Sequence, residues 1–150
     1  MDSMETSDPE AARALATAGE LRAVLGRLTR RLREAAHLTQ FTWPQIQVLG
    51  RLERDGPATA SALARAEGVR PQSMGETVAG LKAAGLISAA PDPVDGRQSL
   101  LSLTFPARGL ILASRVARQD WLFHAMRDKL DPAQQERLAD AAALLKRLLD

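Results

Sequence analysis

A long apolar stripe near the N-terminus constrains the fold of this 150-residue chain more than any other feature. Apolar residues recur there at steps of three and four, the spacing of one helix face: Leu15, Ala18, Leu21, Leu25, Leu28 and Leu32. A helix of about 30 residues is about 45 Å long, whereas a compact globule of this chain length is about 38 Å across. We therefore expect this helix to project and to pack its stripe against a second copy of the chain, in a homodimer.

Capping motifs predict where three helices begin. In each motif, a side chain that can accept a backbone N–H is followed three residues later by Glu or Gln: Ser7 and Glu10, Thr42 and Gln45, Asp131 and Gln134. Two short helices are expected in the middle of the chain, over residues 61–66 and from Pro71 to about Ala83. The residues between them, Glu67-Gly68-Val69, form a tight turn, and a further long helix starts at Phe105-Pro106 and runs to about Leu130.

Nearly all of the strand character lies in one hairpin. It starts at Leu86-Ile87, turns through residues 91–96 and returns through residues 100–104. Two short helices and a tight turn followed by a hairpin predict a winged helix-turn-helix domain. The expected fold is therefore mainly α with a small β-hairpin wing. We expect residues 42–104 to form the winged helix-turn-helix DNA-binding domain, and residues 7–40 and 106–150 to form a helical dimerisation region.

Composition excludes several other classes of protein. Hydrophobic residues make up 45% of the chain, which is enough for a core. With no cysteine, the chain has no disulfide, thiolate metal site or cysteine nucleophile. We expect no metal, no cofactor and no catalytic residues, because no ligand cluster, nucleophile–base pair or phosphate loop is visible. The sequence shows neither a secretory signal nor a spanning apolar run, so we expect a soluble, cytoplasmic protein with no membrane partner.

Net charge alone says little about a nucleic-acid partner. The formal charge is only +2, and the pI of about 9.7 reflects the lack of Tyr and Cys that would titrate above neutral pH. Residues 51–97 carry 6 basic and 6 acidic side chains. The cluster of arginines from Arg27 to Arg33 is interpreted as a solvated helix face. A prediction of DNA binding therefore depends on where individual side chains lie.

Candidate DNA-binding residues lie on the second short helix and at the hairpin tip: Arg70, Gln72, Ser73, Glu76, Asp95 and Arg97. Pro71 at the first helical position places Arg70 at the cap. Gln72 can bond adenine with two hydrogen bonds, and Ser73 suits a phosphate or a base edge. For Glu76 two interpretations stay open: it accepts a hydrogen bond from cytosine N4, or it only orients an arginine.

Arg97 is the only cation between Lys82 and Arg108, and it lies beside the expected hairpin tip. A guanidinium can enter a narrow A·T minor groove, where the negative potential is enhanced. Asp95, two residues earlier, is expected to hold that side chain through a bidentate pair. The alternative is an exposed ion pair with no role in DNA binding.

The stretches GVRPQSMGETVAGLKAAGLI (residues 68–87) and DPVDGRQSLLSLT (residues 92–104) resemble the MarR family of bacterial transcription regulators. The second stretch looks like the family's wing, with its Asp-x-Arg and its final Leu-Thr. The resemblance implies a homodimeric repressor that binds a pseudo-palindromic operator in double-stranded DNA. It also implies a small anionic or aromatic effector, bound between the dimerisation helices and the winged domain. Glu76 departs from the family pattern, in which a basic residue is common.

Three residues just before the second helix map near that crevice and are the candidate ligand-binding residues: His37, Phe41 and Trp43. The alternative is that these side chains, like Trp121 and Phe123, pack in the core or an interface. Two other functions stay open. The balanced charge of residues 51–97 is compatible with a winged-helix protein-interaction module that has weak or no DNA binding, and an enzyme with an unrecognised site is the remaining alternative.

Overall fold

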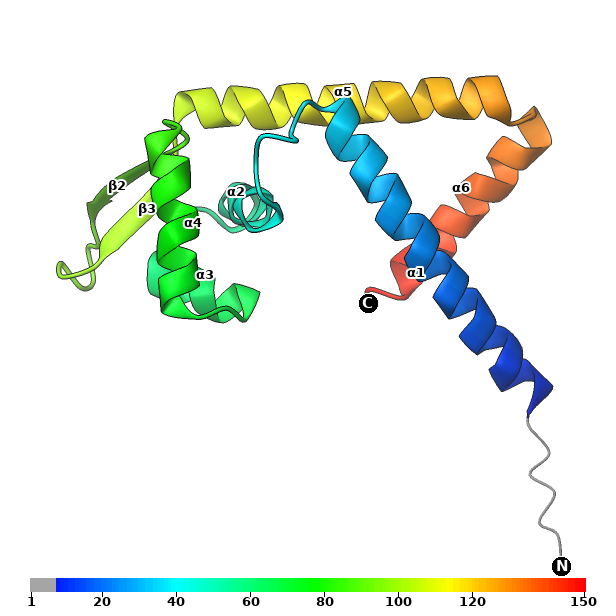
Figure 1. Cartoon of the computed structure of the whole chain (residues 1–150), viewed down its shortest axis with the longest axis horizontal. Helices are drawn as coiled ribbons and strands as arrows, with labels where there is room; N and C mark the ends of the chain where they lie inside the picture. Colours follow the sequence, from blue (N-terminus) through cyan, green and yellow to red (C-terminus); the bar gives the residue numbers. More distant parts are fainter. Residues whose placement is uncertain (1–7) are drawn as a thin grey trace, which may run out of the picture.

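The computed structural model describes residues 8–150 and has the expected mainly helical architecture with a small β wing. Its helices are α1 (Pro9–Ala35), α2 (Trp43–Asp55), α3 (Ala60–Glu67), α4 (Pro71–Ala83), α5 (Phe105–Lys129) and α6 (Pro132–Arg147). Its strands are β1 (Ala58–Thr59), β2 (Ile87–Pro91) and β3 (Ser99–Leu103). Helix α5 runs along the molecule, with the winged part at its N-terminal end and α6 turning back at the other (Figure 1). Within residues 8–150, no helix has both the length and the apolar character to cross a membrane.

The predicted helix caps are confirmed at two of three places. Capping boxes close the starts of α2, through Thr42 and Gln45, and of α6, through Asp131 and Gln134. Helix α1 is capped instead by Asp8, whose carboxylate accepts a 3.0 Å hydrogen bond from the backbone N–H of Glu10. Ser7, the expected cap, lies outside the described residues.

One hydrophobic core holds α2, α3, α4 and the sheet together. The largest fully buried side chains are Val48 of α2, Leu63 of α3, and Met74 and Leu81 of α4. Ala107, in the first turn of α5, is buried in the same core. Because α4 turns Met74 and Leu81 inward, no other segment of residues 8–150 covers its opposite face.

The sheet contains a strand that the sequence interpretation missed. Strand β1 pairs antiparallel with β3, so the order is β1-β3-β2, with Ala58 opposite Leu101. Its second residue, Thr59, also caps α3 by accepting a hydrogen bond from the Ala62 N–H. A strand of two residues is too short to show an alternating pattern, so Thr59 was interpretable only as a cap. The extra strand connects the start of α3 directly to the wing.

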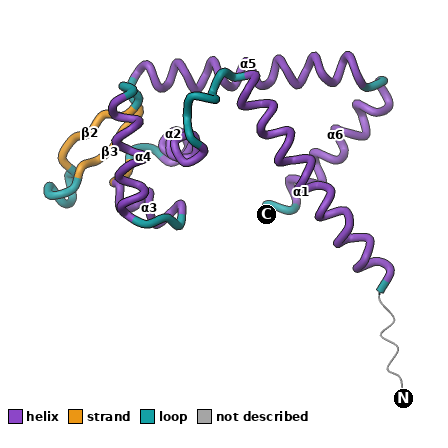
Figure 2. Tube along the Cα trace, viewed as in Figure 1, coloured by secondary structure: helices purple, strands orange, loops and turns teal. Residues whose placement is uncertain are grey.

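The predicted projecting helix is confirmed. The C-terminal end of α1 lies against α5, and the N-terminal part of the helix extends away from the winged part (Figure 2). Neither α1 nor α6 has a buried residue. Large apolar side chains stay exposed on α1, α5 and α6, among them Leu15 (76%), Val116 (60%) and Leu144 (60%). These faces have no partner within the described part of a single chain.

Candidate nucleic-acid interface

The tight turn between α3 and α4 forms because Gly68 adopts a left-handed conformation, with φ of 65°. Arg70 follows as the N-cap residue of α4 and uses its backbone alone for that role, since its side chain makes no capping hydrogen bond. Pro71 stands at the first helical position. The side chain of Arg70 is thus left at the helix start, where the backbone N–H groups also favour an anion.

The first turns of α4 present a polar face to solvent. Gln72, Ser73 and Glu76 are all exposed, on the side opposite buried Met74. Gly75 lies between them, and a Cβ atom at this position would meet open space. The chain's own packing therefore does not require glycine at position 75, and another molecule can approach the backbone there closely.

Glu76 is unusual among the acidic side chains of residues 51–97. The others each have a partner: Glu53 with Arg115, Asp55 and Glu67 with Arg51, Asp92 with the Val94 N–H, and Asp95 with Arg97. Glu76 has no hydrogen bond or ion pair within residues 8–150. No arginine of the described chain is therefore oriented by this carboxylate.

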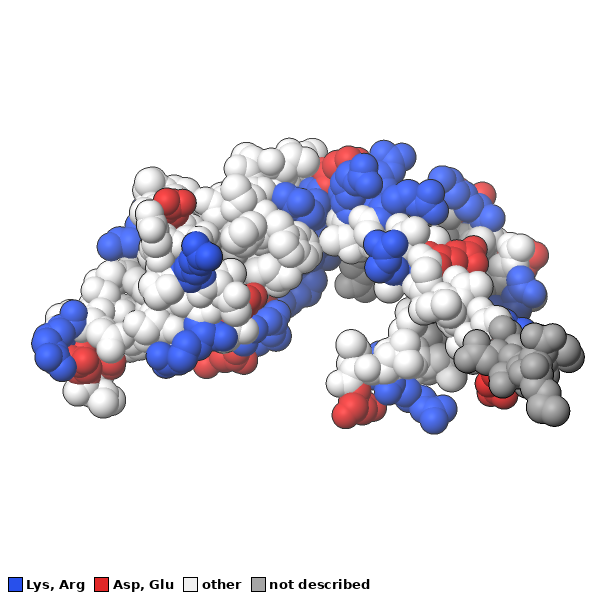
Figure 3. Space-filling view, turned by 60° about the horizontal axis from the view of Figure 1, so that its bottom comes forward, with Lys and Arg blue, Asp and Glu red and all other residues white. Residues whose placement is uncertain are grey.

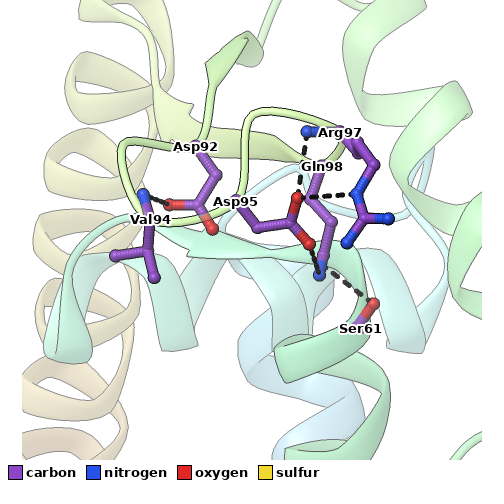
Figure 4. A network of polar contacts seen from close by, with 6 residues as sticks. All are labelled: Ser61, Asp92, Val94, Asp95, Arg97 and Gln98. Atoms are coloured by element: carbon purple, nitrogen blue, oxygen red, sulfur yellow. Dashed lines mark hydrogen bonds and ion pairs between the residues drawn. The ribbon is translucent and has the colours of Figure 1, made fainter.

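At the wing tip, four side chains form a connected network (Figure 4). Arg97 donates to Asp95 Oδ1 from its Nε at 3.2 Å and from its backbone N–H at 3.1 Å. Gln98 Nε2 donates to the other oxygen of Asp95 at 3.4 Å, and Gln98 Oε1 accepts from Ser61 Oγ of α3 at 3.2 Å. The expected ion pair is present, but the expectation that it is bidentate is wrong: both Arg97 donors bond Oδ1, and Oδ2 accepts from Gln98.

These contacts keep the wing-tip carboxylate ionised. The hydrogen bond from the Arg97 side chain lowers the pKa of Asp95, and the Arg97 backbone N–H and the Gln98 amide lower it further. The Arg97 side chain is nevertheless 92% exposed, whereas that of Asp95 is 33% exposed. Within the described residues the two outer nitrogens of the guanidinium make no hydrogen bond. The result is an exposed cation whose Nε is held by Asp95 and whose outer edge is free.

The winged region carries mixed charge rather than a continuous basic face. In Figure 3, basic and acidic side chains lie next to one another over its end of the molecule. Arg51 is held by Glu67 at 2.6 Å and by Asp55 at 3.3 Å, and the Glu67 hydrogen bond raises the pKa of Arg51. Arg54, Arg65, Arg70 and Lys82 form no ion pair within residues 8–150.

A separate cavity of about 450 Å³ lies where α1, α2 and α5 meet. Its walls combine apolar side chains, such as Leu32, Ile46 and Leu110, with charged ones. The charged lining residues are Arg33, Arg54, Arg115, Arg118 and Glu53. Arg115 Nη2 donates to Glu53 Oε1 at 2.6 Å, so one of these arginines is already paired.

Two buried polar atoms of the cavity lining have no hydrogen-bond partner within residues 8–150: Arg33 Nε and Ser114 Oγ. The rest of the Arg33 guanidinium is engaged, since Nη2 donates to the Phe41 carbonyl at 2.9 Å and Cζ lies 5.7 Å from the centre of the Trp43 ring. Burying an unsatisfied polar group costs about 1–3 kcal/mol. Because its walls hold both charged and apolar side chains, the cavity suits a molecule that has polar as well as apolar atoms.

The three candidate ligand residues have different surroundings. Trp43 lines the cavity. Phe41 packs against the core of the winged region, and its carbonyl accepts a hydrogen bond from Arg33. His37 is not among the residues that line the cavity. It follows the C-terminus of α1 in a left-handed conformation, with φ of 55°, and the next residue, Leu38, donates its N–H to the Arg33 carbonyl. The sequence interpretation missed the arginines, although the three-residue step from Arg115 to Arg118 places both on one helix face.

Two short helices joined by a tight turn, followed by a hairpin that reaches beyond them, define a winged helix-turn-helix protein. Residues 39–98 match the sequence model of the MarR family. HTH-type transcriptional regulators of Mycobacterium bovis and Mycobacterium tuberculosis are each 36% identical to the chain over 133 residues, which is 89% of this chain and 92% of theirs. The chain belongs to the MarR family of transcriptional regulators.

Solved structures agree with this assignment. A transcriptional regulator protein of Pseudomonas aeruginosa is 34% identical, with a TM-score of 0.83 over 92% of this chain and 96% of its own. A MarR mutant of E. coli shares the fold at 21% identity, with a TM-score of 0.72 over 89% and 96%. So does a MepR mutant of S. aureus bound to an oligodeoxyribonucleotide, at 18% identity and a TM-score of 0.66 over 89% and 98%.

Proposed function

We propose that this MarR-family regulator is a homodimeric repressor that binds double-stranded DNA sequence-specifically and is released by a small effector. The DNA-binding part of this proposal rests on Arg97, whose side chain is 92% exposed while its Nε is held by Asp95. A cation fixed at a hairpin tip suits a narrow A·T minor groove. The DNA-bound MepR mutant supports the proposal, since a protein of the same fold is seen there on an oligodeoxyribonucleotide.

The exposed first turns of α4 would enter the major groove. In this arrangement Gln72 bonds an adenine edge, Ser73 bonds a phosphate or a base edge, and Arg70 contacts a phosphate beside the helix start. Glu76 is directed at cytosine N4, the base donor that a carboxylate accepts in the major groove. The lack of any partner for Glu76 within residues 8–150 supports this role over the orientation of an arginine.

A second copy of the chain is the partner proposed for the exposed apolar faces. Val116 of α5 and Leu144 of α6 are each 60% exposed in the single chain. Burying such apolar side chains against a symmetry-related second copy removes their surface from water and so stabilises the dimer. Two-fold symmetry then predicts a pseudo-palindromic operator, with half-sites about 34–36 Å apart along the DNA.

The effector is proposed to be a small aromatic or apolar anion bound in the cavity between α1, α2 and α5. Its anionic group would bond Arg115, which lines the cavity and whose side chain is 55% exposed. Its apolar part would contact Trp43 and the aliphatic wall. Helix α2 belongs to the winged region, whereas α1 and α5, together with α6, form what we call the helical frame. A ligand that contacts both parts can therefore favour one arrangement of the two over another.

Mixed charge on the winged region favours one rival function, a protein-interaction module. Fluorescence anisotropy with duplex DNA from the region upstream of the protein's own gene separates the two, with an unrelated duplex as control. The proposal expects sequence-selective binding that weakens with salt, with a log–log slope of about −0.9 per phosphate contacted. Absent or unselective binding would favour the interaction module.

A cytoplasmic location belongs to the same proposal, because a bacterial regulator meets its DNA there.

A further inference from the structure

Gln98 holds a central position in the wing-tip network that neither the family's wing motif nor the proposed DNA contacts explain. Its backbone closes the loop from both sides, since its carbonyl accepts from the Asp92 N–H at 2.9 Å and its N–H donates to the Asp95 carbonyl at 3.0 Å. Its half-buried side chain lies between Asp95 and Ser61. In Figure 4 the amide joins the hairpin tip to a side chain of α3.

We propose that Gln98 is a positioning residue for DNA recognition: it ties the wing tip to α3 through Ser61 and fixes Asp95 so that the outer nitrogens of Arg97 stay free for DNA. The inference rests on the proposed function, because it assigns Gln98 a role only if Arg97 contacts DNA. Gln98 itself is not assigned a DNA contact; it acts through Asp95.

The chemistry of the amide explains why glutamine suits this position. Its oxygen accepts from the Ser61 hydroxyl at 3.2 Å while its nitrogen donates to Asp95 Oδ2 at 3.4 Å. A carboxylate has only acceptors, so a glutamate at this position could accept from Ser61 but could not donate to Asp95.

The orientation of Asp95 bears on how Arg97 binds, because Gln98 bonds one carboxylate oxygen and Arg97 the other. A carboxylate with both oxygens available pairs with a guanidinium through two parallel hydrogen bonds, which use two of its nitrogens. Here Arg97 bonds Oδ1 alone through its Nε, at 3.2 Å. Because Gln98 bonds Oδ2, it holds the carboxylate in an orientation that leaves the outer edge of the guanidinium free for minor-groove acceptors.

Ser61 gives the wing tip a fixed place relative to the recognition helix. It lies in the first turn of α3, directly after the β1 strand that pairs with β3. Helix α3 in turn packs against α4. The Ser61–Gln98 contact bridges 37 positions of sequence and is a second connection between α3 and the hairpin. Fixing the tip before DNA arrives lowers the ordering cost of binding.

The test is a double-mutant cycle on the full chain, with anisotropy on the selected operator as readout. We expect Gln98→Ala to weaken binding about three- to tenfold, the effect of one net hydrogen bond. In an Arg97→Ala background the same change is expected to weaken binding by less than about twofold, because Gln98 then has no arginine to position. Gln98→Glu, which cannot donate to Asp95, is expected to behave like Gln98→Ala.

Two controls keep a structural effect apart from a positioning effect. Ser61→Ala removes the α3 end of the bridge and should also weaken binding, whereas Ser88→Ala, at an exposed serine with no side-chain hydrogen bond in the described chain, should not. In the free protein, the ¹⁵N heteronuclear NOE of the Arg97 Nε–H should fall in Gln98→Ala, since the guanidinium becomes mobile. Far-UV circular dichroism confirms that each variant is folded.

Each remaining outcome overturns a specific claim. An equal loss of affinity in both backgrounds means that Gln98 contacts DNA itself or destabilises the wing generally, and overturns the positioning role. Unchanged affinity and an unchanged NOE in Gln98→Ala overturn it as well. If the unaltered chain binds no duplex DNA selectively, the proposed function fails and this inference fails with it.

Discussion

Arg115 of α5 donates to Glu53 of α2 across 2.6 Å and so links the helical frame to the winged region with an ion pair. Both residues line the cavity between α1, α2 and α5. An anion in that cavity would compete with Glu53 for Arg115. A small ligand in the cavity could therefore act directly on one of the contacts between the two parts.

Replacement of Arg115 should therefore weaken binding of an anionic aromatic molecule. We expect Arg115→Ala to lower the affinity for benzoate about tenfold, since a charge-assisted hydrogen bond contributes about 1.5–3 kcal/mol. Isothermal titration calorimetry measures this directly. Arg31→Ala, at an arginine paired with Glu34 on the exposed face of α1, is the matched control and should leave affinity unchanged. Equal affinities for all three proteins would contradict the proposed ligand site.

The wing-tip carboxylate should titrate below the ordinary aspartate range of about 3.9. The Arg97 side chain, first among its causes, lowers the pKa of Asp95. A lowered pKa in the folded state stabilises the fold above the ordinary value and loses that effect as pH falls through the folded value. Carboxyl ¹³C NMR should show the pKa of Asp95 rising in Arg97→Ala. A pKa that stays the same would mean that the pair does not persist in solution.

Glu76 should select for cytosine at one position of each half-site. Glu76→Gln is expected to shift that preference towards adenine, because glutamine bonds adenine N6 and N7 while a carboxylate accepts from cytosine N4; the discrimination is about 1–3 kcal/mol. Anisotropy against operators that differ at each single base pair tests this. If Glu76→Gln strengthens binding equally on every sequence, the substitution only relieves repulsion from phosphates.

A charge placed on the exposed face of α6 should dissociate the dimer. Leu144 is 60% exposed in the single chain, so Leu144→Glu does not disturb the core. We expect a monomer mass by analytical ultracentrifugation at micromolar concentration, against a dimer for the unaltered chain. Val94→Glu is the matched control, because Val94 is 94% exposed but lies at the wing tip. A dimer in Leu144→Glu would place the interface elsewhere.

Most of the fold was predictable because local signals are strong in this chain. The caps at Thr42 and Asp131, the turn at Gly68 and the inward face of α4 each follow from residue type and spacing. Strand β1 was not predictable, because it exists only through its pairing with β3. Its two residues carry no pattern of their own.

The sites were less predictable than the fold, since they combine side chains that are distant in sequence. Asp95 and Arg97 are neighbours, and their pairing was expected. The Gln98–Ser61 contact and the group of Arg33, Ser114 and Arg115 around one cavity depend on how helices pack. A glutamine at position 98 does not by itself predict the hydrogen bond with Ser61, because that contact requires α3 to lie beside the wing.

The most direct test of the central claim, that Arg97 reads the minor groove from a fixed wing tip, is the affinity of Arg97→Ala for two operators. One has A·T pairs where the wing would lie, and the other has G·C pairs there. We expect Arg97→Ala to lose about 1–3 kcal/mol of binding free energy on the A·T operator and less on the G·C operator, whose minor groove lacks the enhanced negative potential. Unchanged affinity for the A·T operator would contradict the account.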